Sequence, residues 1–453
     1  MKPKRILALL MAALMLGGCA ADIAVDSNRY ALALANYPTL TDYTADYNKV
    51  AELDAAGWSD YSEVEPYYEA YFNNEAAYYE ELSTLRQGAE EACPDLTTFS
   101  AETIAALFAQ REENTVYSPV NLYMALAMLA ECTDGNTRSE ILALLGTDDS
   151  RTAANAMWRM LYQSGRTVCT PANSMWGGEV IPIRQSLAET LAEYYYADSF
   201  TVPMGTPEAD QAMQTWINDH TGNLLEDAVK SVRTDPSTVL TLISTLYFKA
   251  MWSNDFSESN TYADTFTTAD GKECTADFMH EESVGNWHLG DRYVSVSRYF
   301  QDGGGSMLFI LPNEGISPTE LLSDTDTVAE ILNAQQEQYT RIQWSVPKFD
   351  VDSSMELSEQ LSAMGLKDVF DPARSDFSPA TDAEGMFLSQ VQHAARVTID
   401  ENGCTAAAFT VMMTCGSALP PDSVLEFDLD RPFAFIILSD TGLPLFVGTV
   451  FEP

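Results

Sequence analysis

The sequence predicts an α+β fold, and three observations lead to that prediction. Apolar residues recur at helical spacing through much of the first half of the chain, whereas short apolar runs bounded by turn residues dominate the second half. Helices and strands that segregate along a chain in this way are typical of α+β architecture. The 453 residues are 46% hydrophobic and 11% aromatic, which is enough for one large domain with an extension, or for two or three ordinary domains.

Each expected helix has a start or stop signal. Ser100 precedes one apolar-periodic run, Pro119 suits a helix start because it needs no backbone donor there, and Gly146 ends a third run. The expected helices cover residues 100–108, 119–129 and 138–145. The expected strands are Thr238–Phe248, Met307–Leu311, Ile342–Val346, Gln390–Ile399, Phe433–Leu438 and Leu445–Val450.

The charge of the chain excludes two classes of partner. The formal net charge is −43 at pH 7. Nucleic-acid phosphates require Lys and Arg, so a nucleic-acid partner is not expected. Electrostatic docking on anionic lipid is excluded for the same reason. The charge is typical of a well-solvated surface.

The first 19 residues have the composition of an export signal. Lys2, Lys4 and Arg5 precede an apolar run over residues 6–16 that is too short to span a bilayer as a mature helix. Leu-Gly-Gly-Cys at 16–19 then resembles the lipobox of bacterial lipoproteins, which are cut before the cysteine and carry a diacylglycerol on its thiol. The resemblance implies a bacterial, extracellular protein that is anchored to the cell surface through lipidated Cys19. The alternative is an ordinary secretory signal in which Cys19 is incidental.

Residues 20–97 form an acidic, tyrosine-rich extension before the main domain at 98–453. Aromatic residues recur at roughly helical spacing between Glu63 and Ala92, which predicts a helix with a possible break at Asn73-Asn74. We expect the extension to be a spacer or tether, and the alternative is a docking surface.

No pattern recommends an enzyme active site or a metal site. The chain lacks the GxSxG, Walker, GxGxxG and HExxH motifs, and its seven cysteines, at 19, 93, 132, 169, 274, 404 and 415, have no CxxC spacing. The four histidines are at 220, 280, 288 and 393. His280-Glu281-Glu282 is expected to be a solvated acidic loop, and Asp324 and Asp326 lack the rest of a calcium loop. We therefore expect no metal, no cofactor and no catalysis.

Motifs in a fixed order resemble the serpin family of serine protease inhibitors. Each motif is weak alone, and their order from about residue 98 to the last residue makes them specific. The matches are 114–119 with 125–129, 172–176, 216–218 with 221–222, 246–249 with Trp252 and Phe256, 347–349, 376–378, 430–433, and 445–448 before Pro453. The resemblance implies a serpin fold with three β-sheets, about nine helices and an exposed reactive centre loop.

The segment after Asp400 resembles the serpin hinge, which reads acidic residue, any residue, Gly, Thr and then small residues ending in Ser or Thr. It departs from that pattern twice: Cys404 replaces the preferred Thr, and Phe409 interrupts the small run. The implied hinge residues are Glu401, Gly403, Cys404, Thr405, Ala406, Ala407, Ala408 and Thr410.

In serpins the cleaved loop becomes a new central strand, and the hinge composition suits that role. A central strand needs every backbone N–H, and no proline lies between Gly403 and Leu419. Strand side chains alternate between faces. The face expected to enter the interior carries small and then apolar residues, Cys404, Ala406, Ala408, Thr410 and Met412, and the other carries Thr405, Ala407, Phe409 and Val411. A disulfide between Cys404 and Cys415 would close the loop into a ring, so both thiols are expected to be reduced.

The resemblance also implies a reactive bond. The family places it fourteen residues after the hinge glycine and three before the paired prolines, and both counts give Ser417–Ala418. Small residues precede this bond, which favours an elastase-like serine protease with a shallow pocket as the target. A slipped register would give Met413 or Thr414 instead.

Serpins gate strand insertion with a buried polar cluster, called the shutter below. The matching positions are Ser118, Asn121, Ser244 and His393. The family's second serine is Asn121 here, and its usual asparagine is Ser244. A buried polar group without a partner costs about 1–3 kcal/mol, so we hypothesise that this reciprocal exchange keeps the cluster hydrogen-bonded.

The function implied by the resemblance is suicide inhibition. A serine protease attacks Ser417, and loop insertion then traps it as a covalent acyl-enzyme. The protein would act as a monomer and touch a membrane only through Cys19. The alternatives are a non-inhibitory serpin that serves as a surface-anchored binding protein, a hydrolase with an unrecognised triad, and a lipid-anchored adhesion module.

Overall fold

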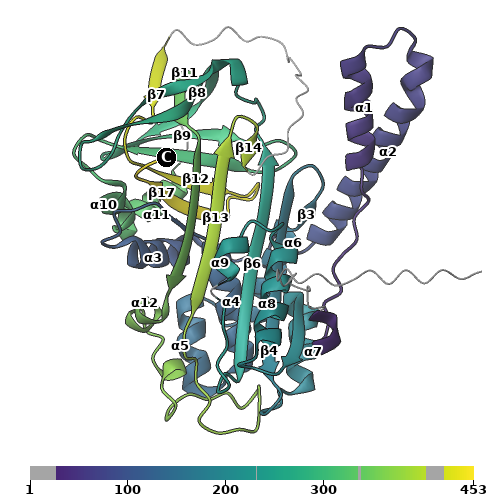
Figure 1. Cartoon of the computed structure of the whole chain (residues 1–453), viewed down its shortest axis with the longest axis vertical. Coiled ribbons are helices and arrows are strands. Elements are labelled where there is room, and N and C mark those ends of the chain that lie inside the picture. The colour runs from purple at the N-terminus through teal and green to yellow at the C-terminus, as the bar shows by residue number, and fades with distance from the viewer. Residues whose placement is uncertain (1–26, 231, 335–337, 405–422) are drawn as a thin grey trace, which may run out of the picture.

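The computed structural model describes residues 27–230, 232–334, 338–404 and 423–453. It has the α+β architecture predicted from the sequence, with two hydrogen-bonded sheets and helices on their faces (Figure 1). The described helices are α1 (Thr44–Ala56), α2 (Tyr61–Arg86), α3 (Thr97–Phe108), α4 (Pro119–Cys132), α5 (Gly135–Leu145), α6 (Ser150–Leu161), α7 (Gln185–Tyr195), α8 (Pro207–His220), α9 (Glu226–Val229), α10 (Pro318–Leu322), α11 (Thr325–Asn333) and α12 (Ser358–Ala363). Helices α3–α12 belong to the main domain, for which about nine were expected.

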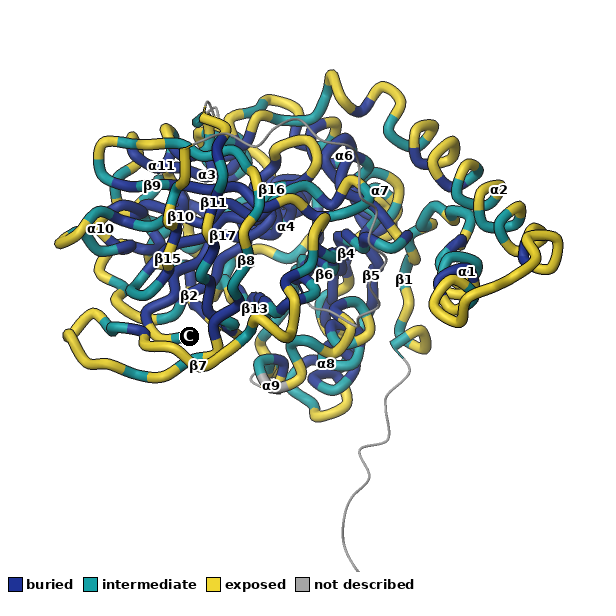
Figure 2. The backbone as a smooth tube through the Cα atoms, turned by 90° about the horizontal axis from the view of Figure 1, so that it is seen from above, coloured by how far each residue is buried: buried dark blue, intermediate teal, exposed yellow. Residues whose placement is uncertain are grey.

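The first sheet has the strand order β1-β5-β4-β6-β14-β13-β12, and β3 also pairs with β4. Its strands are β1 (Ala31–Ala33), β3 (Gln163–Ser164), β4 (Val168–Gly178), β5 (Ala197–Val202), β6 (Leu240–Met251), β12 (Phe349–Glu356), β13 (Gln392–Asp400) and β14 (Gly403–Cys404). Seen from above, α4, α6 and α7 lie on one side of β4, β5 and β6, and α8 and α9 lie on the other (Figure 2). Helices therefore lie on both sides of β4, β5 and β6, whereas β12 alternates between buried and exposed residues.

The second sheet has the order β15-β11-β8-β9-β10-β16-β17-β2, with β7 paired to β8. Its strands are β2 (Thr115–Tyr117), β7 (Thr261–Thr267), β8 (Glu273–Leu289), β9 (Tyr293–Tyr299), β10 (Ser306–Pro312), β11 (Gln338–Pro347), β15 (Val424–Asp428), β16 (Phe433–Leu438) and β17 (Pro444–Val450). The described strands join into two sheets rather than three because β8 pairs with β7 at its start and with β9 at its end.

The local signals read from the sequence place most elements, with errors at their ends. Gly146 ends α5 in the left-handed conformation (φ 66°), as its position predicts. Helix α3 begins at Thr97 rather than Ser100, because Asp95 accepts a hydrogen bond from the Thr97 backbone N–H. Helix α2 passes through Asn73-Asn74 without a break, and the Asn74 side chain donates to Asp46 of α1.

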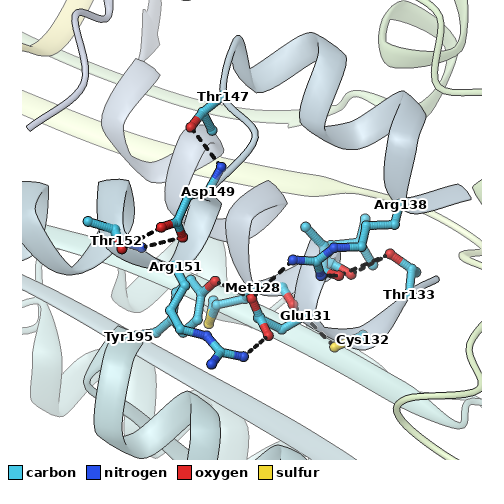
Figure 3. A network of polar contacts seen from close by, with 12 residues as sticks. Met128, Glu131, Cys132, Thr133, Arg138, Thr147, Asp149, Arg151, Thr152 and Tyr195 are labelled. Atoms are coloured by element: carbon cyan, nitrogen blue, oxygen red, sulfur yellow. Dashed lines mark hydrogen bonds and ion pairs between the residues drawn. The ribbon is translucent and has the colours of Figure 1, made fainter. Parts of the chain in front are cut away.

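Helix α4 is the central helix of the domain, and almost all of it is buried. Glu131, the second-last residue of α4, is 7% exposed. Its carboxylate accepts hydrogen bonds from Arg151 (2.7 Å), Arg138 (3.4 Å) and the Tyr195 hydroxyl (3.0 Å), as Figure 3 shows. Burial alone would raise the pKa of Glu131, but these hydrogen bonds and charges hold it below its usual value. The ionised carboxylate thus ties α4 to α5, α6 and α7.

The extension packs against the main domain. Strand β1 adds to the edge of the first sheet beside β5. The Tyr37 ring lies 5.8 Å from that of Trp158, and the Tyr162 hydroxyl donates to the Pro38 carbonyl (3.2 Å). Helices α1 and α2 then form a hairpin that stands out from the domain (Figure 1). The role of this segment as a tether stays a prediction.

The base of the hairpin is fixed by buried tyrosines and by ion pairs. Tyr43 is 1% exposed, and its ring packs 5.1 Å from that of Tyr78. The Arg166 guanidinium lies 3.7 Å from the Tyr47 ring and pairs with Asp302 (3.2 Å). Burial raises the pKa of Asp302. These contacts join the hairpin to the β3–β4 and β9–β10 turns.

We expect Tyr43→Ala to destabilise the docked hairpin by about 3–5 kcal/mol, the usual cost of removing a buried aromatic ring. Tyr67→Ala is the matched control, since Tyr67 lies on the same hairpin and is 44% exposed, and it should change stability by less than about 0.5 kcal/mol. Hydrogen–deuterium exchange of α2 measures both effects. Equal protection of α2 in the two variants would contradict a docked hairpin.

Candidate functional site

The hinge residues Gly403 and Cys404 lie inside the first sheet. They form β14, which pairs antiparallel with β13 (Ile399 opposite Cys404) and with β6 (Cys404 opposite Ala250). Figure 1 shows β14 between the upper ends of β6 and β13. The first two residues of the segment predicted to insert therefore already occupy a central strand position.

Gly403 is required by the close approach of β6. A Cβ at this position would lie 2.2 Å from the Ala250 carbonyl oxygen, and the backbone adopts a φ of 148°, which side chains disfavour. The glycine of the hinge pattern thus has a steric cause in this chain.

The turn from Asp400 to Asn402 connects β13 to β14 and is held by its neighbours. The Asp400 carboxylate accepts from the Asn402 and Gly403 N–H groups (2.8 and 3.3 Å). Glu401 pairs with the Lys348 ammonium at 2.9 Å. Burial alone would raise the pKa of Glu401, but the hydrogen bond and charge of Lys348 keep it below its usual range. These hydrogen bonds and this ion pair therefore hold the conformation of the turn.

Cys404 is buried within the first sheet. It is 3% exposed, and both residues opposite it, Ile399 and Ala250, are 1% exposed. It forms no disulfide with another of the described cysteines. The sheet thus holds a small side chain between two buried neighbours at this position.

Beyond β14, no ladder joins β6 to β13 among the described residues. A cavity of about 20 Å³ lies between Thr245 and Leu246 of β6 and residues 394–396 of β13. Asn121 of α4 and Phe446 of β17 also line it. The sheet is thus split along the line that leads away from Cys404.

Three of the four predicted shutter residues come together at this split. The Ser118 backbone N–H donates to His393 Nε2 (3.1 Å), and the Asn121 N–H donates to Ser118 Oγ (3.3 Å). Ser118 is the N-cap of α4, so the helix start is fixed directly to β13. Burial lowers the pKa of His393 to about 4, which keeps the imidazole neutral and able to accept this bond.

The two exchanged shutter residues, Asn121 and Ser244, do not hydrogen-bond in the way that the hypothesis requires. Asn121 Oδ1 and Ser244 Oγ are both buried without a hydrogen-bond partner among the described residues. Ser244 lies on β6 opposite Asn173 of β4, whereas Asn121 lines the cavity between β6 and β13. The two exchanged groups therefore face different surroundings in the described structure.

The remaining predicted site residues lie outside the described residues. They are Cys19, hinge residues Thr405, Ala406, Ala407, Ala408 and Thr410, and the reactive bond Ser417–Ala418.

Sequence reasoning assigned no role to the residues that hold the hinge turn. Trp252 and Phe256 donate backbone N–H bonds to the Asn402 and Glu401 carbonyls (both 2.9 Å). In the sequence, Trp252 and Phe256 belong to the serpin-like motif that begins at residue 246, and this membership was the only indication of a role for them. Arg298, which packs against both, gave no signal at all.

The part of the chain that is described holds no cluster of side chains arranged for a metal ion. The His280 segment lies in strand β8 rather than in the expected loop. The His280 ring stacks on the Tyr262 ring of β7, with 4.0 Å between the ring centroids. Asp324 caps helix α11. No helix in the described ranges is long and apolar enough to cross a membrane.

Comparison with known proteins agrees with this geometry. Residues 95–453 match the family model for serpins, the serine protease inhibitors. The chain is 28% identical to Serpin-Z2B of Triticum aestivum, covering 79% of this chain and 95% of that protein, and 27% identical to the plasma serine protease inhibitor of Mus musculus, covering 80% and 90%. The native state of tengpin, a thermophilic serpin, superposes with a TM-score of 0.71 at 26% identity, covering 79% of this chain and 94% of tengpin.

The family match spans most of the chain, and the hinge strand, the split sheet and the Ser118–His393 contact lie within it. The chain therefore belongs to the serpin family, whose members are typically protease inhibitors.

Proposed function

We propose that this protein inhibits serine proteases by inserting its cleaved loop into the first sheet. The observation that carries the proposal is β14, a two-residue strand paired on both sides at the head of the split between β6 and β13. A strand that continues from Cys404 down this split would find backbone partners on both flanking strands.

The proposed reaction has two stages. The serine hydroxyl of the protease attacks the carbonyl carbon of Ser417, the Ser417–Ala418 bond breaks, and the new amine of Ala418 takes the proton. The loop, joined to the protease as an ester, then enters the sheet from Gly403 onward. The enzyme is carried with it and distorted before water hydrolyses the ester.

Small residues before the reactive bond support an elastase-like target. Residues 414–417 are Thr, Cys, Gly and Ser, which suit a shallow specificity pocket and offer no basic group to a trypsin-like enzyme. This protein would be the substrate of one incomplete turnover rather than a catalyst.

The alternative is a non-inhibitory serpin that serves as a binding protein. The environment of Cys404 favours inhibition, because its small side chain fits between Ile399 and Ala250 without displacing either strand. Side chains of the same size class follow at 406 and 408 in the sequence.

We also propose that lipidated Cys19 holds a monomeric protein at the outer cell surface. The lipobox-like sequence at 16–19 supports this. Cys19→Ser should move the protein from the membrane fraction to the medium, because the thioether anchor is lost. Wild-type protein that stays soluble after expression in a lipoprotein-processing bacterium would contradict the anchor.

Mixing the protein with pancreatic or neutrophil-type elastase should give a covalent complex that survives denaturing electrophoresis. Cleavage at Ser417–Ala418 also releases the peptide from Ala418 to Pro453, which mass spectrometry identifies. Cleavage without complex would support the non-inhibitory alternative.

Cys404→Glu should convert the inhibitor into a substrate that is cleaved but not trapped. The new carboxylate would have to enter a position that is 3% exposed, and a buried charge without a partner is costly. Thr405→Glu is the matched control, since it lies on the opposite face of the expected strand. Equal trapping by both variants would contradict insertion in this register.

Stability should fall as the pH drops from about 6.5 toward 4, because of His393. Its pKa is lowered to about 4 in the folded protein, whereas an unfolded histidine titrates near pH 6.5. In this window the unfolded state binds more protons, so the loss is at most about 1.4 kcal/mol per pH unit. Urea midpoints across the window measure it.

His393→Gln should flatten this slope, because glutamine still accepts from the Ser118 N–H but does not titrate. His280→Gln is the control and should keep the slope, since it leaves His393 in place. An unchanged slope in His393→Gln would show that other groups cause the pH dependence.

A further inference from the structure

Arg298 of β9 is a buried cation in an aromatic pocket beside the hinge. It is 6% exposed. The centre of its guanidinium group lies 3.7 Å from the Phe256 ring, 5.3 Å from the Trp344 ring and 5.5 Å from the Trp252 ring. Cation–π contacts of this kind strengthen when the cation is removed from water.

The same guanidinium makes two polar contacts. It forms an ion pair and hydrogen bond with Glu281 of β8, and it donates to the Asn254 backbone carbonyl. Arg298 therefore fixes both the backbone at Asn254 and the ring of Phe256, two residues further on. An arginine with its partners already in place is costly to remove from such a site.

Residues 252–256, called the strap below, hold the hinge turn. The Trp252 N–H donates to the Asn402 carbonyl and the Phe256 N–H to the Glu401 carbonyl, both at 2.9 Å. The Trp252 indole Nε1–H donates to the Asp400 carbonyl at 3.0 Å. Each carbonyl of the turn from Asp400 to Asn402 thus accepts a bond from the strap.

We propose that Arg298 is a positioning residue for loop insertion, which acts through the strap to keep Gly403 and Cys404 in the sheet. The chain of contacts runs from the guanidinium to Asn254 and Phe256, from the strap to the turn, and from the turn to β14. The effect on trapping rests on the proposed inhibitory function, whereas the position of Cys404 does not.

The physical reason is that a strand grows more easily from a pair that already exists. The first residues of a new strand lose backbone freedom before they gain a ladder on both sides. β14 removes that step, because its two residues are already bonded to β6 and β13. A loosened strap would let Gly403 and Cys404 leave the sheet, and insertion would have to start again while the acyl-enzyme hydrolyses.

The test uses Cys404 as a reporter in Arg298→Leu. Native protein is treated with N-ethylmaleimide, and alkylation of each cysteine is followed by peptide mass spectrometry. Cys132 and Cys169 are internal references, because they are 0% and 3% exposed and lie on α4 and β4 rather than on the strap. We expect Cys404 to react about tenfold faster than in wild type, the order expected for loss of a charged hydrogen bond, while both references stay unchanged.

Two further variants separate positioning from general damage. Arg292→Leu is the matched control, since it removes an arginine next to the other end of β9 whose partners are Glu320 and Asp324, and it should leave Cys404 protected. Arg298→Leu with Glu281→Leu removes the carboxylate left without its partner, and it should still expose Cys404 if the single variant folds poorly.

Unchanged alkylation of Cys404 in both Arg298 variants would overturn the proposal. Equal acceleration at Cys404, Cys132 and Cys169 would also overturn it, since that pattern reports general loosening. With an elastase that wild type traps, Arg298→Leu should need more inhibitor per enzyme. If wild type traps no protease, the proposed function fails, and the alkylation result still decides the role of Arg298.

Discussion

The structure depends on a sheet in which, among the described residues, β6 and β13 are joined only through the two residues of β14. Buried backbone groups strongly favour hydrogen-bonded partners, so two neighbouring strands held apart are a strained arrangement that other parts of the molecule must maintain. Here β14 closes only the upper end of the split between β6 and β13. Helix α4 lies on one side of the sheet and α8 on the other (Figure 2).

Helix α4 links the split to the rest of the domain at both of its ends. Its start is fixed to β13 by the bond from the Ser118 N–H to His393, and its end is fixed by Glu131 between Arg138, Arg151 and Tyr195 (Figure 3). A shift of β13 relative to α4 must therefore stretch the bond to His393, because the other end of the helix cannot follow. His393 accepts this bond through Nε2, which only the neutral imidazole can do, and burial keeps the ring neutral.

The sequence was sufficient to predict features that depend on local pattern. Pro119 and Gly146 marked helix ends, because these effects act within a few residues. Docking of the extension could not be predicted, since Tyr43 and Tyr67 look alike in sequence and differ only in whether the β3–β4 turn covers them. Arg298 was invisible for the same reason: its pocket gathers residues from β8, β9, β11 and the strap.

The small hinge side chains also bear on what would drive the proposed insertion. A strand of Cys, Ala and Thr buries few methylene groups, each worth about 0.8 kcal/mol, so side-chain burial adds little per residue. The larger gain would come from completing two backbone ladders at once, along β6 and along β13, where a central strand bonds on both sides. Bulkier side chains would raise the burial term but would have to displace Asn121 and Phe446, which line the cavity of about 20 Å³. Small side chains would therefore let the proposed strand enter while leaving α4 in place.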